Sequence, residues 1–313
     1  MQKTWFERAI FFSWYCGIRD CAYCYMSTQP EKNDAVRSKE SLLAELIICK
    51  KLGWEIGFIS GGIGAFSRAK FRDLLESMHK TAKEKLWINV GALKKEDLQD
   101  YLPYIKGVVG SIECVNDEIH KKVCPSKPAE PYFEMFEEAS KMGLMNAMTI
   151  IVGLGESIKD FDKLKDIINK YIIKKIHFYG LNPQKGTIFE NTSPPSVEYQ
   201  AEWIKKTRES FPDMDIQCGI WEDRTNYIKT LLEAGATSIS KYPALKKFGS
   251  ESAFEIEKQA KLAGRKFEGT LTKLPEIDWN AVVGGLDFGG ELKDKIKIKL
   301  HQYLKQMQNN SHS

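Results

Sequence analysis

The stretch that decides the fold is residues 9–24, AIFFSWYCGIRDCAYC, in which an apolar segment runs into a loop with three cysteines. Residues 9–15 are apolar or aromatic at nearly every position, which is typical of a strand buried on both faces. Similar short runs recur along the chain. We therefore predict parallel strands over residues 9–15, 55–60, 87–90, 108–112, 148–152, 175–179, 215–218 and 237–240.

Amphipathic segments alternate with these strands. Their apolar residues recur at three- and four-residue spacing, which predicts helices over residues 39–52, 68–83, 95–102, 132–142, 158–173, 197–209 and 223–233. This alternation predicts an α/β fold, a (β/α)8 TIM-type barrel with its active site at the C-terminal ends of the strands. We assign residues 1–250 to the barrel and 251–313 to a C-terminal extension that packs on it. That extension holds a helix over 251–263 and a helix or strand over 292–306.

The composition is that of an ordinary globular protein. Of 313 residues, 42% are hydrophobic and 28% charged, and 46 Lys+Arg against 42 Asp+Glu give a net charge of +4. This charge is too small to indicate nucleic-acid binding, and no apolar run reaches the ~20 residues of a membrane span. Residues 1–8 lack the apolar core of a signal peptide, so we expect a cytoplasmic protein. Without a secretion signal, seven cysteines indicate metal or redox chemistry rather than disulfides.

The three clustered cysteines are separated by four and then two residues. Cys16, Cys21 and Cys24 directly follow the first predicted strand, so they belong to a loop at the catalytic face. Three thiolates can hold three irons of a 4Fe-4S cluster and leave the fourth iron open. A zinc site would need a fourth protein ligand, and neither a nearby histidine nor a second C-x2-C pair is present. An iron-sulfur cluster is therefore the preferred interpretation, with zinc or three structural cysteines as alternatives.

This loop resembles that of the radical SAM superfamily. The resemblance implies that Cys16, Cys21 and Cys24 bind a 4Fe-4S cluster and that S-adenosylmethionine (SAM) ligates the open iron. It also implies that Tyr23 contacts the adenine ring. The commonest spacing in that family has three residues between the first two cysteines, and this chain has four.

Further motifs match the family in order along the chain. The resemblance assigns Gly61 and Gly62, after the second strand, to the methionine end of SAM, and Glu113, after the fourth, to its ribose or amine. Residues 149–156, TIIVGLGE, resemble the adenine-binding stretch, which implies roles for Gly153, Gly155 and Glu156. The alternative for each is ordinary: glycines that turn a strand into a helix, and glutamates that cap or face solvent.

The resemblance is strongest to biotin synthase and its relatives. It includes residues 124–128 (CPSKP), 181–187 (LNPQKGT) and 234–239 (AGATSI). Biotin synthase itself holds a second cluster with cysteines on the second, third and fifth strand segments. The corresponding positions lie near Phe58, Trp87 and Ala147, so we do not expect this chain to be biotin synthase.

Four cysteines lie outside the loop. Cys49 falls on an apolar helix face and is expected to be a packed thiol. Cys114, Cys124 and Cys218 all lie at or beyond strand ends, so we predict that they can hold an auxiliary cluster that gives up a sulfide. Cys114 and Cys218 would then be catalytic. Without that cluster, Cys114 could act alone as a thiol and Cys218 would be packing.

These residues lead to one predicted function and two alternatives. An auxiliary cluster implies sulfur insertion into an unactivated C–H bond. The pattern most resembles one component of the archaeal two-protein lipoyl synthase, and that resemblance implies an octanoyl chain on a carrier protein as the substrate. The partners would then be a second radical SAM protein and an electron donor such as ferredoxin or flavodoxin. The first alternative is a radical SAM enzyme that rearranges or cleaves a small molecule, resembling methylornithine synthase or the hydrogenase-cofactor maturases. The second is a non-catalytic iron-sulfur scaffold. Lys241, after the last strand, could contact an acidic group of a substrate or simply be solvated.

Overall fold

A computed structural model describes residues 2–28 and 35–310 of the chain. Eight parallel strands form one sheet in sequence order, and the (β/α)8 prediction is confirmed. The first and last strands meet through a single parallel bridge between Phe6 and Ile239, so the barrel is nearly closed. The strands are β2 (Glu7–Phe11), β3 (Glu55–Ser60), β4 (Leu86–Asn89), β5 (Ile105–Glu113), β6 (Met145–Val152), β7 (Ile173–Gly180), β8 (Asp215–Gly219) and β9 (Ser238–Ser240).

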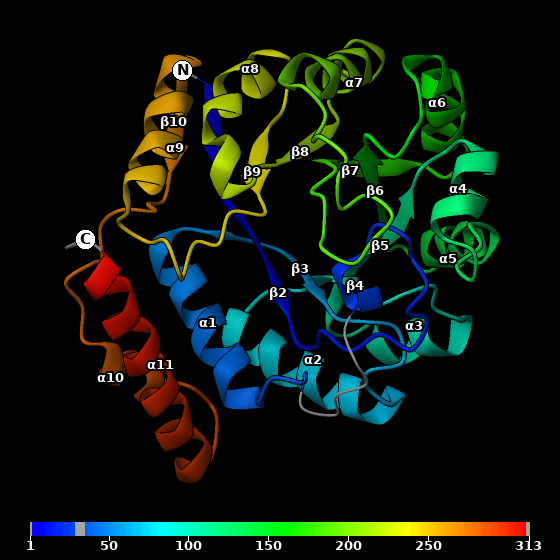
Figure 1. Cartoon of the computed structure of the whole chain (residues 1–313). Coiled ribbons are helices and arrows are strands. Elements are labelled where there is room, and N and C mark those ends of the chain that lie inside the picture. Colours follow the sequence, from blue (N-terminus) through cyan, green and yellow to red (C-terminus); the bar gives the residue numbers. More distant parts are fainter. Residues whose placement is uncertain (1, 29–34, 311–313) are drawn as a thin grey trace.

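Helices surround this sheet as an outer ring (Figure 1). The ring comprises α1 (Lys39–Leu52), α2 (Arg68–Ala82), α3 (Lys95–Tyr101), α4 (Asp117–Val123), α5 (Glu130–Lys141), α6 (Phe161–Lys170), α7 (Val197–Ser210) and α8 (Ile228–Glu233). Local sequence sets their ends, because Ser67 caps the start of α2 and Gly53 ends α1 with a φ of 70°. The single helix predicted over 223–233 is instead a 3-10 turn, η3 (Glu222–Tyr227), followed by α8. Helix α4 was not predicted.

The first strand is shorter than predicted. It ends at Phe11 rather than at residue 15, because the chain leaves the barrel at Ser13. There the backbone turns toward residues 35–36: Trp14 donates to the Ala35 carbonyl at 2.9 Å, and Ser13 bridges Val36. The strand's apolar pattern continues into this turn, so the pattern alone places the boundary too late.

The C-terminal residues add secondary structure outside the ring. Helix α9 (Glu251–Leu262) leads into β10 (Arg265–Glu268), which pairs in parallel with β1 (Gln2–Trp5). Helix α10 (Trp279–Gly284) precedes α11 (Gly290–Asn310), which lies against α1 (Figure 1). The segment 292–306 is thus a helix. It buries one helical stripe, consisting of Ile296, Leu300, Leu304 and Met307.

The barrel interior is filled below the C-terminal ends of the strands. At its base, Glu7 accepts from Lys175 at 2.6 Å and from Ser238 at 2.7 Å. Above this polar group lies an apolar cluster of Phe58, Trp87, Val109 and Ala147. Three of these occupy the positions where biotin synthase was expected to have cysteines. This layer separates a cavity at the base, beside Glu7 and Lys175, from the space at the C-terminal ends of the strands, where the predicted site residues lie.

Candidate active site

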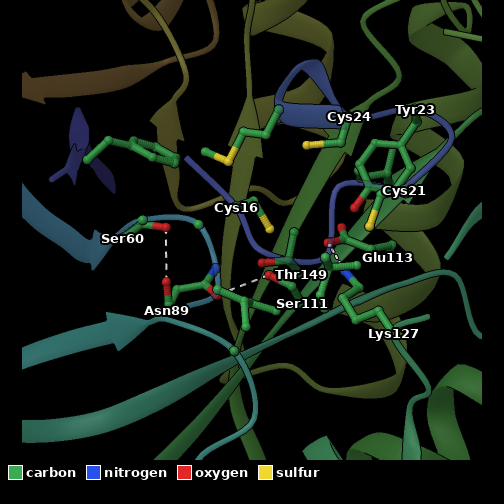
Figure 2. Close-up of a pocket in the computed structure, with 18 of the residues that line it drawn as sticks. Cys16, Cys21, Tyr23, Cys24, Ser60, Asn89, Ser111, Glu113, Lys127 and Thr149 are labelled. Atoms are coloured by element: carbon green, nitrogen blue, oxygen red, sulfur yellow. Dashed lines mark hydrogen bonds and ion pairs between the residues drawn. The ribbon is translucent and has the colours of Figure 1, made fainter. Parts of the chain in front are cut away.

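Two adjoining cavities open at the C-terminal ends of the strands. The smaller, of about 200 Å³, lies between the cysteine loop and the barrel; the larger, of about 430 Å³, lies beside it over β7 and the end of β8. Figure 2 shows side chains that line the smaller cavity. Both cavities share the residues Phe11, Tyr23, Cys24, Met26, Ile151, Tyr179 and Lys241.

The cysteine loop is docked onto the barrel by backbone hydrogen bonds. Gly17 N–H donates to the Ile63 carbonyl at 2.7 Å, and Ala22 N–H donates to the Val123 carbonyl at 2.8 Å. These bonds place Cys16, Cys21 and Cys24 along the wall of the smaller cavity, as predicted (Figure 2). Within residues 2–28 and 35–310, no three histidine, cysteine or acidic side chains converge as they would for a single metal ion. Three soft thiolate donors around a shared space fit an iron-sulfur cluster.

Two of these thiols are held protonated in the protein alone. A hydrogen bond with Cys124, together with burial, raises the pKa of Cys21 well above its usual range. Burial raises the pKa of Cys24 to about 11. Because thiolates are the metal ligands, cluster binding must release these protons.

Gly61 and Gly62 line the smaller cavity and also carry the cysteine loop. A methyl group added to Gly62 would lie 1.8 Å from the Tyr15 carbonyl oxygen, and one added to Gly61 would lie 2.4 Å from the Phe12 ring. Neither contact is tolerable, so side chains are excluded here by packing. The two glycines let the loop approach β3 closely, a role beyond the predicted contact with SAM.

A row of polar side chains crosses the floor of the smaller cavity (Figure 2). The Ser60 hydroxyl donates to the Asn89 carbonyl at 3.0 Å, and the Ser111 hydroxyl donates to Asn89 Oδ1 at 3.1 Å. These bonds tie the ends of β3, β4 and β5 together. Because Asn89 Oδ1 is already an acceptor, its amide N–H groups remain to serve a bound molecule.

Glu113 ends β5 with a φ of 65°, a left-handed conformation that is uncommon outside glycine. Its carboxylate accepts from Lys127 Nζ at 2.9 Å, and both side chains are about 7% exposed. Burial acts to lower the pKa of Lys127, but the Glu113 carboxylate together with the neighbouring thiols and Tyr132 outweighs it, and the pKa lies above the usual value. This ion pair fixes a negative charge at the cavity wall, where Glu113 was predicted to meet SAM.

The predicted adenine-binding stretch forms a tight turn after β6. Glu156 accepts from the Gly153 N–H at 2.6 Å and from the Leu154 N–H at 2.8 Å, while Gly153 and Gly155 have φ values of 100° and 117°. Glu156 therefore holds the turn. In the described structure Ile151, rather than Gly153, Gly155 or Glu156, lines the two cavities.

The other cysteines fall into separate environments. Cys114 and Cys124 are 2% and 1% exposed and lie in a small apolar cluster that includes Cys21. Cys218 is fully buried in the main core, where its thiol donates to the Ser238 carbonyl at 3.3 Å. The reason is strand alternation: Gln217 faces the barrel interior and bonds to Glu7, so Cys218 faces the helices. The structure does not bring Cys218 together with Cys114 and Cys124.

Several residues at the site were not predicted. Asn89 is the last residue of β4, and its position could have indicated it. Ile151, next to last in β6, lies within the predicted adenine-binding stretch 149–156, but no role was assigned to it. Lys127 lies in the loop after α4, and no sequence pattern links it to Glu113. Only the fold brings these two side chains together.

The sequence comparisons agree with this geometry. The sequence model of the Radical SAM superfamily matches residues 15–168, from the cysteine loop into α6. A protein of Methanocaldococcus jannaschii, MJ0597, is 38% identical over 275 residues, which cover 86% of this chain and 76% of that protein. This chain belongs to the radical SAM superfamily.

Relatives named by activity locate this radical SAM protein within the superfamily. The 7,8-didemethyl-8-hydroxy-5-deazariboflavin synthase of Archaeoglobus fulgidus is 30% identical over 53% of the chain and 54% of the synthase. Biotin synthase of Methanococcus vannielii is 24% identical over 56% of the chain and 54% of the enzyme. The chain spans about half the length of each. These matches agree with the biotin synthase-like branch.

The fold has solved counterparts. The crystal structure of methylornithine synthase superposes with a TM-score of 0.67 at 16% identity, covering 95% of this chain and 86% of that one. This likeness concerns the barrel fold. Among the described helices, none has both the length and the apolar content to cross a membrane.

Proposed function

We propose that this radical SAM enzyme acts on a small molecule seated in the larger cavity, with one cluster and no auxiliary cluster. The observation that carries the proposal is the outward orientation of Cys218. The thiols that lie near Cys114 and Cys124 are then Cys21 and Cys24, which the proposal assigns to the SAM-binding cluster, so no separate third ligand remains for an auxiliary cluster among the described residues. The two relatives named above are synthases of small molecules by their names, which supports the small-molecule part of the proposal.

The residues of the chain have distinct parts in this proposal. Cys16, Cys21 and Cys24 would hold the cluster, and Gly61, Gly62 and Asn89 would meet SAM above β3 and β4. When bound, a cluster of this kind would supply the single electron needed for reductive cleavage of SAM, and this chemistry would provide the oxidising power to remove a hydrogen atom from the substrate.

The larger cavity supplies the enclosure that such radical chemistry needs. Its walls include the rings of Tyr179 and Trp221, and the partly exposed rings of Trp14 and Tyr25 lie at its mouth, so a bound substrate would be shielded from much of the solvent. It adjoins the smaller cavity through shared residues, so a substrate there lies next to the SAM site. An external one-electron donor such as ferredoxin or flavodoxin belongs to the proposal.

Sulfur insertion into an octanoyl chain on a carrier protein, together with a second radical SAM protein, has less support. That reaction needs a sulfur source, and the biotin synthase-type positions are filled by Phe58, Trp87 and Ala147. The scaffold alternative predicts no SAM cleavage at all, so it is distinguished by the same experiment.

The test is anaerobic reconstitution with iron and sulfide, followed by iron analysis and Mössbauer spectroscopy. We expect about four irons per chain in the wild type and in Cys218→Ala, and none in the triple variant Cys16, Cys21, Cys24→Ala. Dithionite-reduced wild type should form 5′-deoxyadenosine from SAM. A four-iron cluster that survives in the triple variant would overturn the proposal in favour of sulfur insertion.

A further inference from the structure

We infer that Lys241 binds a carboxylate of the substrate, so that the substrate class is a small monocarboxylate with an apolar or aromatic body. This inference rests on the proposed function, because it places the substrate in the larger cavity. It assigns a recognition role to a residue that borders both cavities.

Lys241 is held in place by its backbone. It directly follows β9 and has a φ of 69°, in the left-handed region that lysine rarely adopts. The next residue, Tyr242, is fully buried, and its hydroxyl bonds to Ser252 at 2.7 Å and to the Lys247 carbonyl at 3.0 Å. Such backbone strain persists where the surroundings fix it, and it occurs preferentially at functional sites. Glu113, at the same cavity, shares this feature.

Aromatic rings surround the ammonium group. Lys241 Nζ lies 4.4 Å from the ring centre of Tyr179, 5.6 Å from that of Phe11 and 6.0 Å from that of Trp221. Ring faces attract a cation, but they replace its water poorly. Burial accordingly lowers the pKa of Lys241. An arriving anion would restore the charge balance that the rings leave incomplete.

The Glu113 carboxylate favours the charge of Lys241 only from a distance and is itself paired with Lys127, so Lys241 has no anion in contact with it among the described residues. Within residues 2–28 and 35–310, its Nζ has neither a carboxylate within 4 Å nor a hydrogen bond. The two most buried lysines differ from Lys241, because each has a carboxylate partner. Lys127 pairs with Glu113 at 2.9 Å, and Lys175 pairs with Glu7 at 2.6 Å. A water-poor lysine that opens onto a cavity without a protein carboxylate is suited to a carboxylate that arrives with a ligand.

The side-chain amide of Asn182 is a second hydrogen-bond donor in the larger cavity. Arg224 donates to the Leu181 carbonyl at 3.2 Å and to Asn182 Oδ1, which fixes the Asn182 amide. Its N–H groups have no acceptor within residues 2–28 and 35–310. Asn182 lines the larger cavity. A carboxylate is acceptor-only, with two oxygens, so donors of this kind match it. The apolar rings that make up much of the remaining wall match an apolar or aromatic body.

The test uses the reconstituted, cluster-loaded protein with SAM present, under anaerobic conditions. The probes are benzoate, 3-phenylpropionate and hexanoate, each paired with its neutral amide, and their binding is measured by calorimetry. We expect at least one acid to bind roughly tenfold or more tightly than its amide. In Lys241→Met this ratio should fall to near one, and Lys241→Arg should retain much of it. Lys246→Met, which changes an exposed lysine nearby, should leave the ratio unchanged.

Three results would overturn the inference. In the first, no acid binds more tightly than its amide; in the second, Lys241→Met keeps the preference. In the third, Lys241→Met weakens the binding of SAM by the same factor as the binding of the acid, which would show that the lysine binds SAM. The same preparation is assayed for 5′-deoxyadenosine. If wild type does not cleave SAM, the proposed function itself fails, whereas cleavage without acid preference refutes only the role of Lys241.

Discussion

Replacing Lys127 by methionine removes one partner of a buried ion pair while keeping the length of the side chain. Its partner Glu113 would keep a carboxylate that is about 7% exposed and has lost its 2.9 Å contact. An uncompensated buried charge of this kind typically costs about 3–5 kcal/mol of stability. We expect that loss in the free energy of unfolding of Lys127→Met.

A matched control is available on the surface. Lys229 and Glu233 form an ion pair of 2.8 Å, but their side chains are 43% and 48% exposed. Lys229→Met should therefore cost less than about 1 kcal/mol. The double variant Glu113→Gln, Lys127→Met should recover part of the loss, because the buried charge is then gone.

Urea unfolding of the apoprotein, followed by circular dichroism under reducing conditions, measures these differences. The raised pKa of Lys127 also determines how these differences in unfolding free energy depend on pH. A raised lysine pKa gives stability that is complete below the unfolded value of about 10.4 and is lost as pH rises through the folded value. The cost of Lys127→Met should thus be constant between pH 6 and 9. A cost as small as that of Lys229→Met would refute the reasoning.

Three further outcomes follow from the site. Gly62→Ala should reduce iron incorporation severalfold, because its methyl group would meet the Tyr15 carbonyl, whereas Gly284→Ala, with open space around it, should incorporate normally. Glu156→Gln should lower the free energy of unfolding by about 1–3 kcal/mol, since one buried N–H loses its acceptor; an unchanged urea midpoint would contradict this. Burial raises the pKa of Cys218 to about 12, so its stabilisation is complete below about pH 8.5 and is lost as pH rises toward 12. Cys218→Ala should therefore make the fall of unfolding free energy between pH 9 and 11 shallower, by up to about 1.4 kcal/mol per pH unit, in urea titrations at each pH.

Most of the fold could be predicted from the alternation of strand and helix patterns, because parallel strands buried on both faces are nearly continuously apolar. The sequence pattern was ambiguous where it fitted both a helix and a strand. In 292–306, lysines at every second position suggested a strand, yet Ile296, Leu300 and Leu304 lie on one helical stripe that packs toward the protein. The pairing of β1 with β10 joins residues over 260 positions apart, and no local pattern predicts it.

The site was predicted where chemistry is local in sequence and not where it depends on side-chain direction. The cysteine loop is local, and its three thiols do line one cavity. Cys218 shows the opposite case. The sequence places it correctly at the end of a strand, but only the neighbouring Gln217, by occupying the interior, decides that the thiol faces outward.

The single bridge between Phe6 and Ile239 gives the barrel wall a seam. Every other neighbouring pair of barrel strands is joined by at least two residue pairs, whereas β9 has only three residues and is bridged on this side to Phe6, the residue just before β2. Lys241 directly follows β9, so the cation sits on the part of the wall with the fewest backbone bonds to resist bending. We therefore expect this side of the substrate chamber to bend more readily than the rest of its wall. Amide hydrogen exchange should be fastest, among the eight barrel strands, along β9.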